Sequence, residues 1–268
     1  MFSQTLIRID AGMKKEQVSY HKIFDSEIFE GTLTSHIYPW HFHDSYTVII
    51  IDSGAMKYVF RDDEVVVNAG EVFIVNAFTA HYNGVLNNID CNYRVMFLPV
   101  RLFNLKEDDK RFTYFEKSVG AKAYSPIGAL YERLKRVEDE ADYIAVTKNI
   151  ANELLTGLEH KTGSLVLNDR VEAAVLYIHQ HIDEKLTIAQ LADACNISHF
   201  HFQRVFKLAT GLTVNAYIQQ CRMERSRELL REGIKPVTTS LESGFFDHSH
   251  FHKQFKKMYA LTPAHLVK

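Results

Sequence analysis

An internal repeat near the C-terminal end constrains this chain more than any other feature. The segment SHFHFQRVFKLATGLT (Ser198–Thr213) aligns with DHSHFHKQFKKMYALT (Asp247–Thr262) at a constant offset of 49 residues. Six positions carry the same residue in both copies: His201/His250, Phe202/Phe251, Phe206/Phe255, Lys207/Lys256, Leu212/Leu261 and Thr213/Thr262. Each copy opens on a residue type that caps helices well. The repeat therefore predicts two similar helical units.

A shorter helical segment precedes each copy, Thr187–Cys195 before the first and Val237–Ser243 before the second. A short helix, a tight turn and a second helix form the plan of a helix-turn-helix unit. Between the copies, Val214–Arg231 contains no Gly or Pro and predicts one helix of about 18 residues, roughly 27 Å long. Its arginines are expected to pair with neighbouring glutamates or to reach phosphates. Such a strut suits two recognition helices about one DNA turn, roughly 34 Å, apart.

The two repeat helices have distinct apolar and polar faces. We expect an inward face made by Phe202, Val205, Phe206 and Ala209 in the first copy and by Phe251, Phe255 and Met258 in the second. The outward face carries Phe200, Gln203, Arg204 and Lys207 in the first copy and His248, Ser249, His252, Lys253 and Lys256 in the second. Gln and Arg bind base edges in the major groove, and Lys binds phosphates. Ordinary solvated faces are the alternative, but two matching copies weaken it.

The first hundred residues have a different pattern, that of short strands. Apolar or alternating runs end at turns, as Tyr46–Ile51 does before Asp52-Ser53-Gly54. Many such runs predict a sandwich or barrel over residues 1–98. Over residues 99–163, Ile127–Val137 and Tyr143–Leu158 predict an amphipathic helical hairpin, a connector or dimerisation region. Lys161–Ser164 is expected to be a linker. The all-α tandem helix-turn-helix domain then covers residues 164–268.

Composition limits the class of protein. The net charge of −2 divides into +3 from Asn168 onward and −5 before it, which weakly favours a nucleic-acid partner for the C-terminal part. The longest apolar run is too short to cross a membrane, and the N-terminus lacks the apolar stretch of a signal peptide. Three widely spaced cysteines in no ligand spacing favour a reduced, cytoplasmic setting.

These C-terminal stretches resemble the tandem helix-turn-helix domain of the AraC/XylS transcription regulators. The resemblance covers Leu186–Ile218 and Gly244–Pro263. It implies base-reading positions at Phe200, Gln203 and Arg204 in the first unit and at His248, Ser249, His252 and Lys253 in the second. The chain departs from the family pattern at Thr239-Ser240, where Ile-Ala is usual, and at Ala260, where Gly is usual. We therefore expect the second unit to pack less tightly than the first.

Three histidines mark the N-terminal domain. His41 and His43 alternate on one strand, and His81 follows a later strand, so the three side chains are expected on one face. The pattern resembles the cupin barrel, but Thr47 stands where a cupin metal site has its carboxylate. Three interpretations remain open: a metal-enzyme site, a metal-free pocket for a small effector, and ordinary structural histidines. The predicted pocket residues are Tyr38, Trp40, His41, His43, Tyr46, Phe78 and His81.

The resemblance favours the effector pocket, because many AraC-type regulators sense a small molecule through a cupin-like domain. It also suggests a homodimer through residues 127–158, with intramolecular packing as the alternative. We therefore expect a sequence-specific regulator that binds double-stranded DNA and a small-molecule effector, with no catalytic residues, metal or cofactor. Two alternatives remain: a cupin metalloenzyme fused to a DNA-binding module, and a regulator whose barrel only dimerises.

Overall fold

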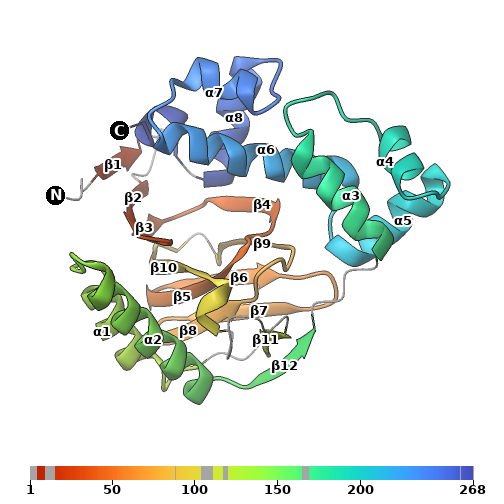
Figure 1. Cartoon of the computed structure of the whole chain (residues 1–268). Coiled ribbons are helices and arrows are strands. Elements are labelled where there is room, and N and C mark those ends of the chain that lie inside the picture. Colours follow the sequence, from red (N-terminus) through yellow and green to blue (C-terminus); the bar gives the residue numbers. More distant parts are fainter. Residues whose placement is uncertain are drawn as a thin grey trace. The chain divides into compact units, whose positions relative to one another are not determined.

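The secondary structure runs from strands to helices along the chain, as Figure 1 shows. The structure is a computed structural model that describes residues 5–9, 16–87, 89–103, 111–116, 120–164, 169–259 and 261–267. The N-terminal part comprises β1 (Thr5–Ile9), β2 (Glu16–Ile23), β3 (Ser26–Leu33), β4 (Ile37–His41), β5 (Ser45–Ser53), β6 (Ala55–Val59), β7 (Glu64–Asn68), β8 (Glu71–Val75), β9 (His81–Val85), β10 (Cys91–Pro99), η1 (Val100–Phe103), β11 (Arg111–Phe115), α1 (Tyr124–Leu134), α2 (Glu140–Gly157) and β12 (His160–Ser164). The C-terminal part comprises α3 (Asp169–Gln180), α4 (Ile188–Ala194), α5 (His199–Thr210), α6 (Val214–Arg231), α7 (Pro236–Glu242), α8 (His248–Tyr259) and η2 (Pro263–His265).

Two sheets build the N-terminal part. One has six strands in the order β1-β2-β3-β10-β5-β8, and the other has four in the order β4-β9-β6-β7. Tyr58 of β6 contacts Phe73 of β8, with ring centroids 5.4 Å apart, so the sheets face each other. Over the described residues the strands form a cupin-like sandwich of two sheets and not one closed barrel. A β-domain followed by a helical domain confirms the predicted fold class.

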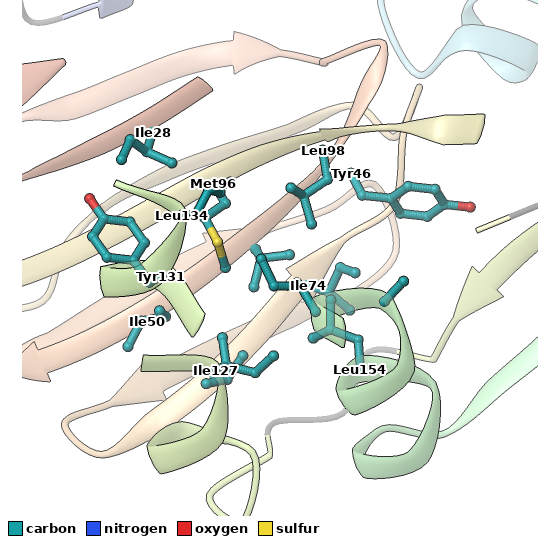
Figure 2. Packing of buried hydrophobic residues seen from close by; sticks show 14 of the residues in the cluster. Ile28, Tyr46, Ile50, Ile74, Met96, Leu98, Ile127, Tyr131, Leu134 and Leu154 are labelled. Carbon is teal, nitrogen blue, oxygen red and sulfur yellow. The ribbon is translucent and has the colours of Figure 1, made fainter. Parts of the chain in front are cut away.

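Strand β5 is buried on both faces, because a second layer covers each side of it. Residues 46–51 are all buried, and the alternate side chains Tyr46, Val48 and Ile50 belong to one hydrophobic cluster with α1 and α2. Figure 2 shows Ile50, Ile74 and Met96 of the sheet beside Ile127 and Leu154 of the helices. The apolar faces of the helical hairpin therefore pack against the six-stranded sheet of their own chain.

The segment after α2 differs from the sequence prediction. Lys161–Ser164, expected to be a linker, lies in β12, which pairs antiparallel with β11 over five residues. The backbone N–H of Glu116 donates to the carbonyl of Glu159 at 2.9 Å, which extends the pairing toward the helices. The prediction was wrong because Thr and a lone Gly are compatible with a short strand as well as with a loop. The pairing brings together the two ends of the segment that contains α1 and α2.

The helices of the first unit follow the predicted pattern with one exception. Thr187 and Gln190 form a capping box at the start of α4. Gly211, with φ of +74°, ends α5 in the left-handed conformation that glycine adopts readily. Phe202 and Phe206 of α5 are buried as predicted, and Val205 is half-buried. Ala209 is exposed and Thr210 is buried instead, because the Thr210 hydroxyl donates to the carbonyl of Phe206 at the turn into Gly211.

The second unit has a continuous aromatic core. Phe251, Phe255 and Tyr259 of α8 contact one another in series, at ring-centroid distances of 5.6 and 4.7 Å, and Met258 is half-buried. Thr239 and Ser240 of α7, which depart from the family pattern, are buried. Their hydroxyls donate to backbone carbonyls, that of Ser240 to Val237 at 2.7 Å. Hydrogen-bonded hydroxyls reduce the cost of this polar substitution. Ala260 lies outside the described residues.

Candidate functional site

Helix α5 presents an exposed stripe opposite its buried phenylalanines. Phe200, Gln203, Arg204 and Lys207, three or four residues apart, are all exposed. Phe200 is 87% exposed, an unusual fraction for a large apolar side chain. The Gln203 amide donates to the carbonyl of His199 at 3.5 Å, so this side chain lies along the helix toward its N-terminus. The stripe combines one apolar side chain with hydrogen-bond donors and acceptors and positive charge.

Helix α8 presents a comparable but more histidine-rich face. Asp247 caps the helix, since its carboxylate accepts from the backbone N–H of Ser249 at 2.8 Å. His248, Ser249 and Lys253 are exposed, whereas His252 and Lys256 are half-buried. The rings of His248 and His252 lie 6.2 Å apart at their centroids, one turn apart on the helix. The five predicted residues therefore lie on α8, but two of them present less surface.

The arginines of the strut α6 are engaged within the protein. The guanidinium of Arg227 lies 2.6 Å from the carboxylate of Glu224, and that of Arg225 lies 3.3 Å from Glu228. Pairing with neighbouring glutamates was one of the two predicted alternatives for the arginines of this helix. Arg222 instead donates to the backbone carbonyls of Ile182 and Glu184. In this arrangement α6 acts as a structural strut, and the exposed faces of α5 and α8 are the candidates for DNA contact.

The structure brings His41, His43 and His81 together. One ligand nitrogen from each histidine lies within 4.8 Å of the others. His41 and His81 are buried and their ring centroids are 4.3 Å apart, while His43 is half-buried. His41 and His81 meet because β4 and β9 are neighbours in the four-stranded sheet. The prediction that His41 and His43 alternate on one strand was wrong, because β4 ends at His41 and His43 lies just beyond it. Burial lowers the pKa of His41 to about 4, so its imidazole is neutral at neutral pH.

Two further contacts, which the sequence does not predict, shape this cluster. Nδ1 of His41 lies 2.6 Å from the carbonyl oxygen of Pro39, which fixes the ring orientation. The ring of Phe97 packs edge-on against His43, with centroids 4.7 Å apart. Phe97 alternates along β10 with Val95 and Tyr93, and this pattern could have predicted that the three side chains share one face of the strand. A single sequence does not reveal which strands pair with β10, so the contact between Phe97 and His43 could not be predicted.

The aromatic residues predicted to line the pocket do not all contact the same neighbours. Tyr38 lies 6.3 Å from His41 between ring centroids, and Trp40 packs edge-on against Tyr82. Phe78 is half-exposed and has a φ of +60°, which is uncommon for a bulky residue. Tyr46 belongs to the hydrophobic cluster with α1 and α2, where its ring packs against Phe103. Its hydroxyl donates to the backbone carbonyl of Thr113.

Comparison with known families identifies both parts of the chain. A family model described as an AraC-like ligand binding domain matches residues 23–142, and a model of a helix-turn-helix domain matches residues 191–268. The chain belongs to the AraC family of transcription regulators. Like other AraC-type regulators, it combines a ligand-binding domain with a DNA-binding helix-turn-helix domain.

Relatives and solved structures are consistent with this AraC-type organisation over most of the chain. The "Uncharacterized HTH-type transcriptional regulator YbfI" of Bacillus subtilis is 24% identical over 244 residues, 87% of this chain and 88% of the relative. The "HTH-type transcriptional activator RhaS" of Citrobacter koseri is 24% identical over 249 residues, 87% of this chain and 89% of RhaS. The crystal structure of ToxT from Vibrio cholerae O395 shares the fold, with a TM-score of 0.60 at 12% identity, and covers 90% of this chain and 96% of ToxT. Among the described residues of this AraC-family chain, no helix has the length and hydrophobicity needed to span a bilayer.

Proposed function

We propose that the exposed stripe of α5 is the main sequence reader of this AraC-type regulator. Phe200, Gln203 and Arg204 contact base edges in the major groove, and Lys207 contacts a phosphate. The observation that carries this proposal is the exposure of all four side chains on one stripe, opposite the buried Phe202 and Phe206. Arginine reads guanine and glutamine reads adenine through paired hydrogen bonds, while an apolar ring suits a thymine methyl group.

The face of α8 has a secondary role in this proposal. His248, Ser249 and Lys253 are exposed and contact phosphates and a few base edges. His252 and Lys256 are half-buried, so they contribute less. A helix whose outer face is mostly histidine and lysine is better suited to phosphates than to bidentate base contacts. The first unit therefore supplies most of the sequence preference.

The effector site lies at the histidine cluster in our proposal. Tyr38, Trp40 and Phe78 supply apolar surface near His41, His43 and His81, whereas Tyr46 is left out because it faces the helices. A small-molecule effector is supported by the match to the ligand-binding family model. One ToxT structure is described as bound to an unsaturated fatty acid, which illustrates a ligand that this fold holds in that protein.

We propose that this protein is a regulator without catalytic activity. Support comes from its relatives, which are named as transcriptional regulators, and from the absence of a carboxylate in the histidine group over the described residues. We place it in the cytoplasm, because a DNA-binding regulator acts where the DNA is.

A homodimer through residues 127–158 completes the proposal. The buried faces of α1 and α2 are used within the chain, so the second copy would meet the outer face of α2, where Ile144 is 43% exposed. The expected effect of Ile144→Lys is a shift from dimer to monomer in analytical ultracentrifugation. A wild-type protein that sediments as a monomer at every concentration would refute the dimer without affecting the DNA-reading proposal.

A binding-site selection experiment tests the main proposal. The full chain selects its preferred sites from randomised DNA, and fluorescence anisotropy then gives the affinity of wild type and Arg204→Ala for every base at each selected position. The expected loss for Arg204→Ala is about 1–3 kcal/mol, confined to one base position whose preference disappears. Arg136→Ala is the matched control, an exposed arginine in the turn between α1 and α2, and should leave affinity and preference unchanged. Unchanged preference in Arg204→Ala would show that α5 does not read bases through this residue.

A further inference from the structure

The turns of the two helix-turn-helix units can be compared bond by bond. In the first unit, the backbone N–H of Ile197 donates to the carbonyl of Ala192 at 3.1 Å, which closes the turn after α4. In the second unit, the N–H of Phe245 makes the equivalent bond to the carbonyl of Ser240 at 2.8 Å after α7. Phe245 is buried, with its ring centroid 5.2 Å from that of Phe251. Both residues of the second bond lie 48 positions after their counterparts, so the first helices and their turns align at an offset of 48.

The second helices of the two units align at a different offset. Helix α5 begins after the N-cap Ser198, and α8 begins after Asp247, which lies 49 positions later. In each helix the N–H four residues on donates to the carbonyl of that first residue, at 2.8 and 2.9 Å. The second unit therefore has one additional residue between the turn and the start of its second helix. That residue is Phe246.

The side chain of this additional residue is exposed. Phe246 is 77% exposed, and among the described residues Phe200 is the only large hydrophobic side chain with a higher fraction. Phe200 is the second residue of α5, and Phe246 lies one residue before the residue that caps α8. Single exposed apolar side chains are common on protein surfaces. Here, however, the two most exposed ones mark the starts of the two helices that are candidates for DNA contact.

The charges at this end of α8 favour an apolar contact. Asp247, His248 and Ser249 include neither lysine nor arginine, and the first such residue of the helix is Lys253, more than one turn further on. Neutralisation of phosphates by lysine or arginine is therefore weak where α8 begins. The N-terminal residues of a recognition helix approach the base edges. DNA offers apolar surface there, in the thymine methyl groups and in the deoxyriboses that border the groove.

We propose that Phe246 packs its ring on the apolar surface of DNA, a thymine methyl group or the adjoining deoxyribose, where α8 enters the major groove. This inference deepens the proposed function and rests on it, since it requires α8 to face DNA. The ring adds affinity because apolar surface of both partners is removed from water, and no ion pair is involved. The second unit thereby has an apolar contact comparable to that of Phe200 in the first.

Fluorescence anisotropy of the full chain on its selected operator tests this inference. Phe246→Ala should weaken binding about 15-fold, the effect of two buried CH2 groups. An apolar contact releases no counterions, so the slope of log K against log salt should keep its wild-type value, whereas Lys253→Ala should reduce that slope by about one. Leu176→Ala is the matched control, because it removes an exposed apolar side chain of α3, outside both units. It should leave the affinity unchanged.

The base preference of the variant identifies the surface that the ring contacts. Loss of a thymine preference at one position in Phe246→Ala assigns the contact to the methyl group, and an equal loss on every sequence assigns it to the sugar. Calorimetry should show a Tm within about 3 °C of wild type, as expected for an exposed side chain. Unchanged DNA affinity in Phe246→Ala, beside weakened binding in Lys253→Ala, overturns the inference and indicates a protein partner for the ring. If both variants bind like wild type, the proposed role of α8 fails together with this inference.

Discussion

Replacing Phe206 by alanine tests which face of α5 is buried, and therefore which face is available to DNA. The Phe206 ring is fully buried and contacts Phe202 and Tyr217, at centroid distances of 5.4 and 5.2 Å. The matched control is Phe200→Ala, the same substitution in the same helix at a side chain that is 87% exposed. Both variants lose the same atoms and the same helix preference, so burial is the difference between them.

The magnitude follows from the contacts of each ring. Phe→Ala in a core costs about 3–5 kcal/mol, and the loss of two aromatic pairs puts Phe206→Ala near the upper end, about 4–5 kcal/mol. For a domain of 60–100 residues, each 1 kcal/mol lowers Tm by about 4–8 °C, so a fall of at least about 15 °C is expected. Phe200→Ala should change the free energy of unfolding by less than about 0.5 kcal/mol, or roughly 3 °C.

Differential scanning calorimetry of the full chain measures both variants. In Phe206→Ala the transition of the helical part should move to lower temperature, while the transition of the β-domain should stay in place. The reasoning is refuted if Phe200→Ala is as damaging as Phe206→Ala, or if Phe206→Ala shifts Tm by less than about 3 °C. Either result would mean that the DNA-reading stripe has been placed on the wrong side of α5.

Two further predictions concern the two domains separately. If Phe200 packs on a thymine methyl group, deoxyuridine at that operator position should weaken wild-type binding about fourfold, the value of one buried methyl at about 0.8 kcal/mol. Phe200→Ala should bind both DNAs equally in an anisotropy titration, and a persisting difference would exclude this contact. In the β-domain, burial alone would raise the pKa of Glu30, but the hydrogen bond and charge of Lys135, 2.7 Å away, lower it on balance. A depressed carboxyl pKa stabilises the fold above the unfolded pKa of 4.5 and loses that effect as pH falls through the folded pKa. Lys135→Met should therefore lower the free energy of unfolding at pH 7 by under about 1 kcal/mol, because the pair is partly exposed. The corresponding fall in Tm should be small at pH 7 and close to zero at pH 3. An equal loss at both pH values would show that packing, and not charge, is responsible.

The sequence predicted the helical part well, because its signals are local. Caps, glycine stops and apolar spacing of three and four residues fixed α4, α5, α6 and α8 to within a few residues. The one inward residue that was wrong, Ala209, lies in the last turn of α5, where the chain leaves the helical path. At that point the neighbouring Thr210 satisfies its hydroxyl within the turn and is buried in place of Ala209.

The β-domain was predicted less well, because its strands pack on both faces. An alternating pattern reveals the buried face only when the other face meets water. Residues 46–51 are all buried, so nothing in their sequence separates the Tyr46 side, toward the helices, from the Thr47 side. Tyr46 was therefore grouped with the histidines, although its side chain belongs to the cluster with α1 and α2. The gathering of His41, His43 and His81 was predicted, but the reason given for His43 was wrong, because β4 ends at His41 and His43 lies beyond the strand.

The pairing of β11 with β12 has a practical consequence for engineering this regulator. Because β11 and β12 lie side by side, the segment between them, which contains α1 and α2, begins and ends at the same place on the β-domain. We call this segment the helical excursion. An excursion held at its base tolerates added length at its far end, which is the exposed turn around Arg136 and Glu138. A fluorescent reporter could be inserted there without changing the spacing of the chain on either side. Removing the excursion is different, since the sheet would then expose Ile74 and Met96 to water.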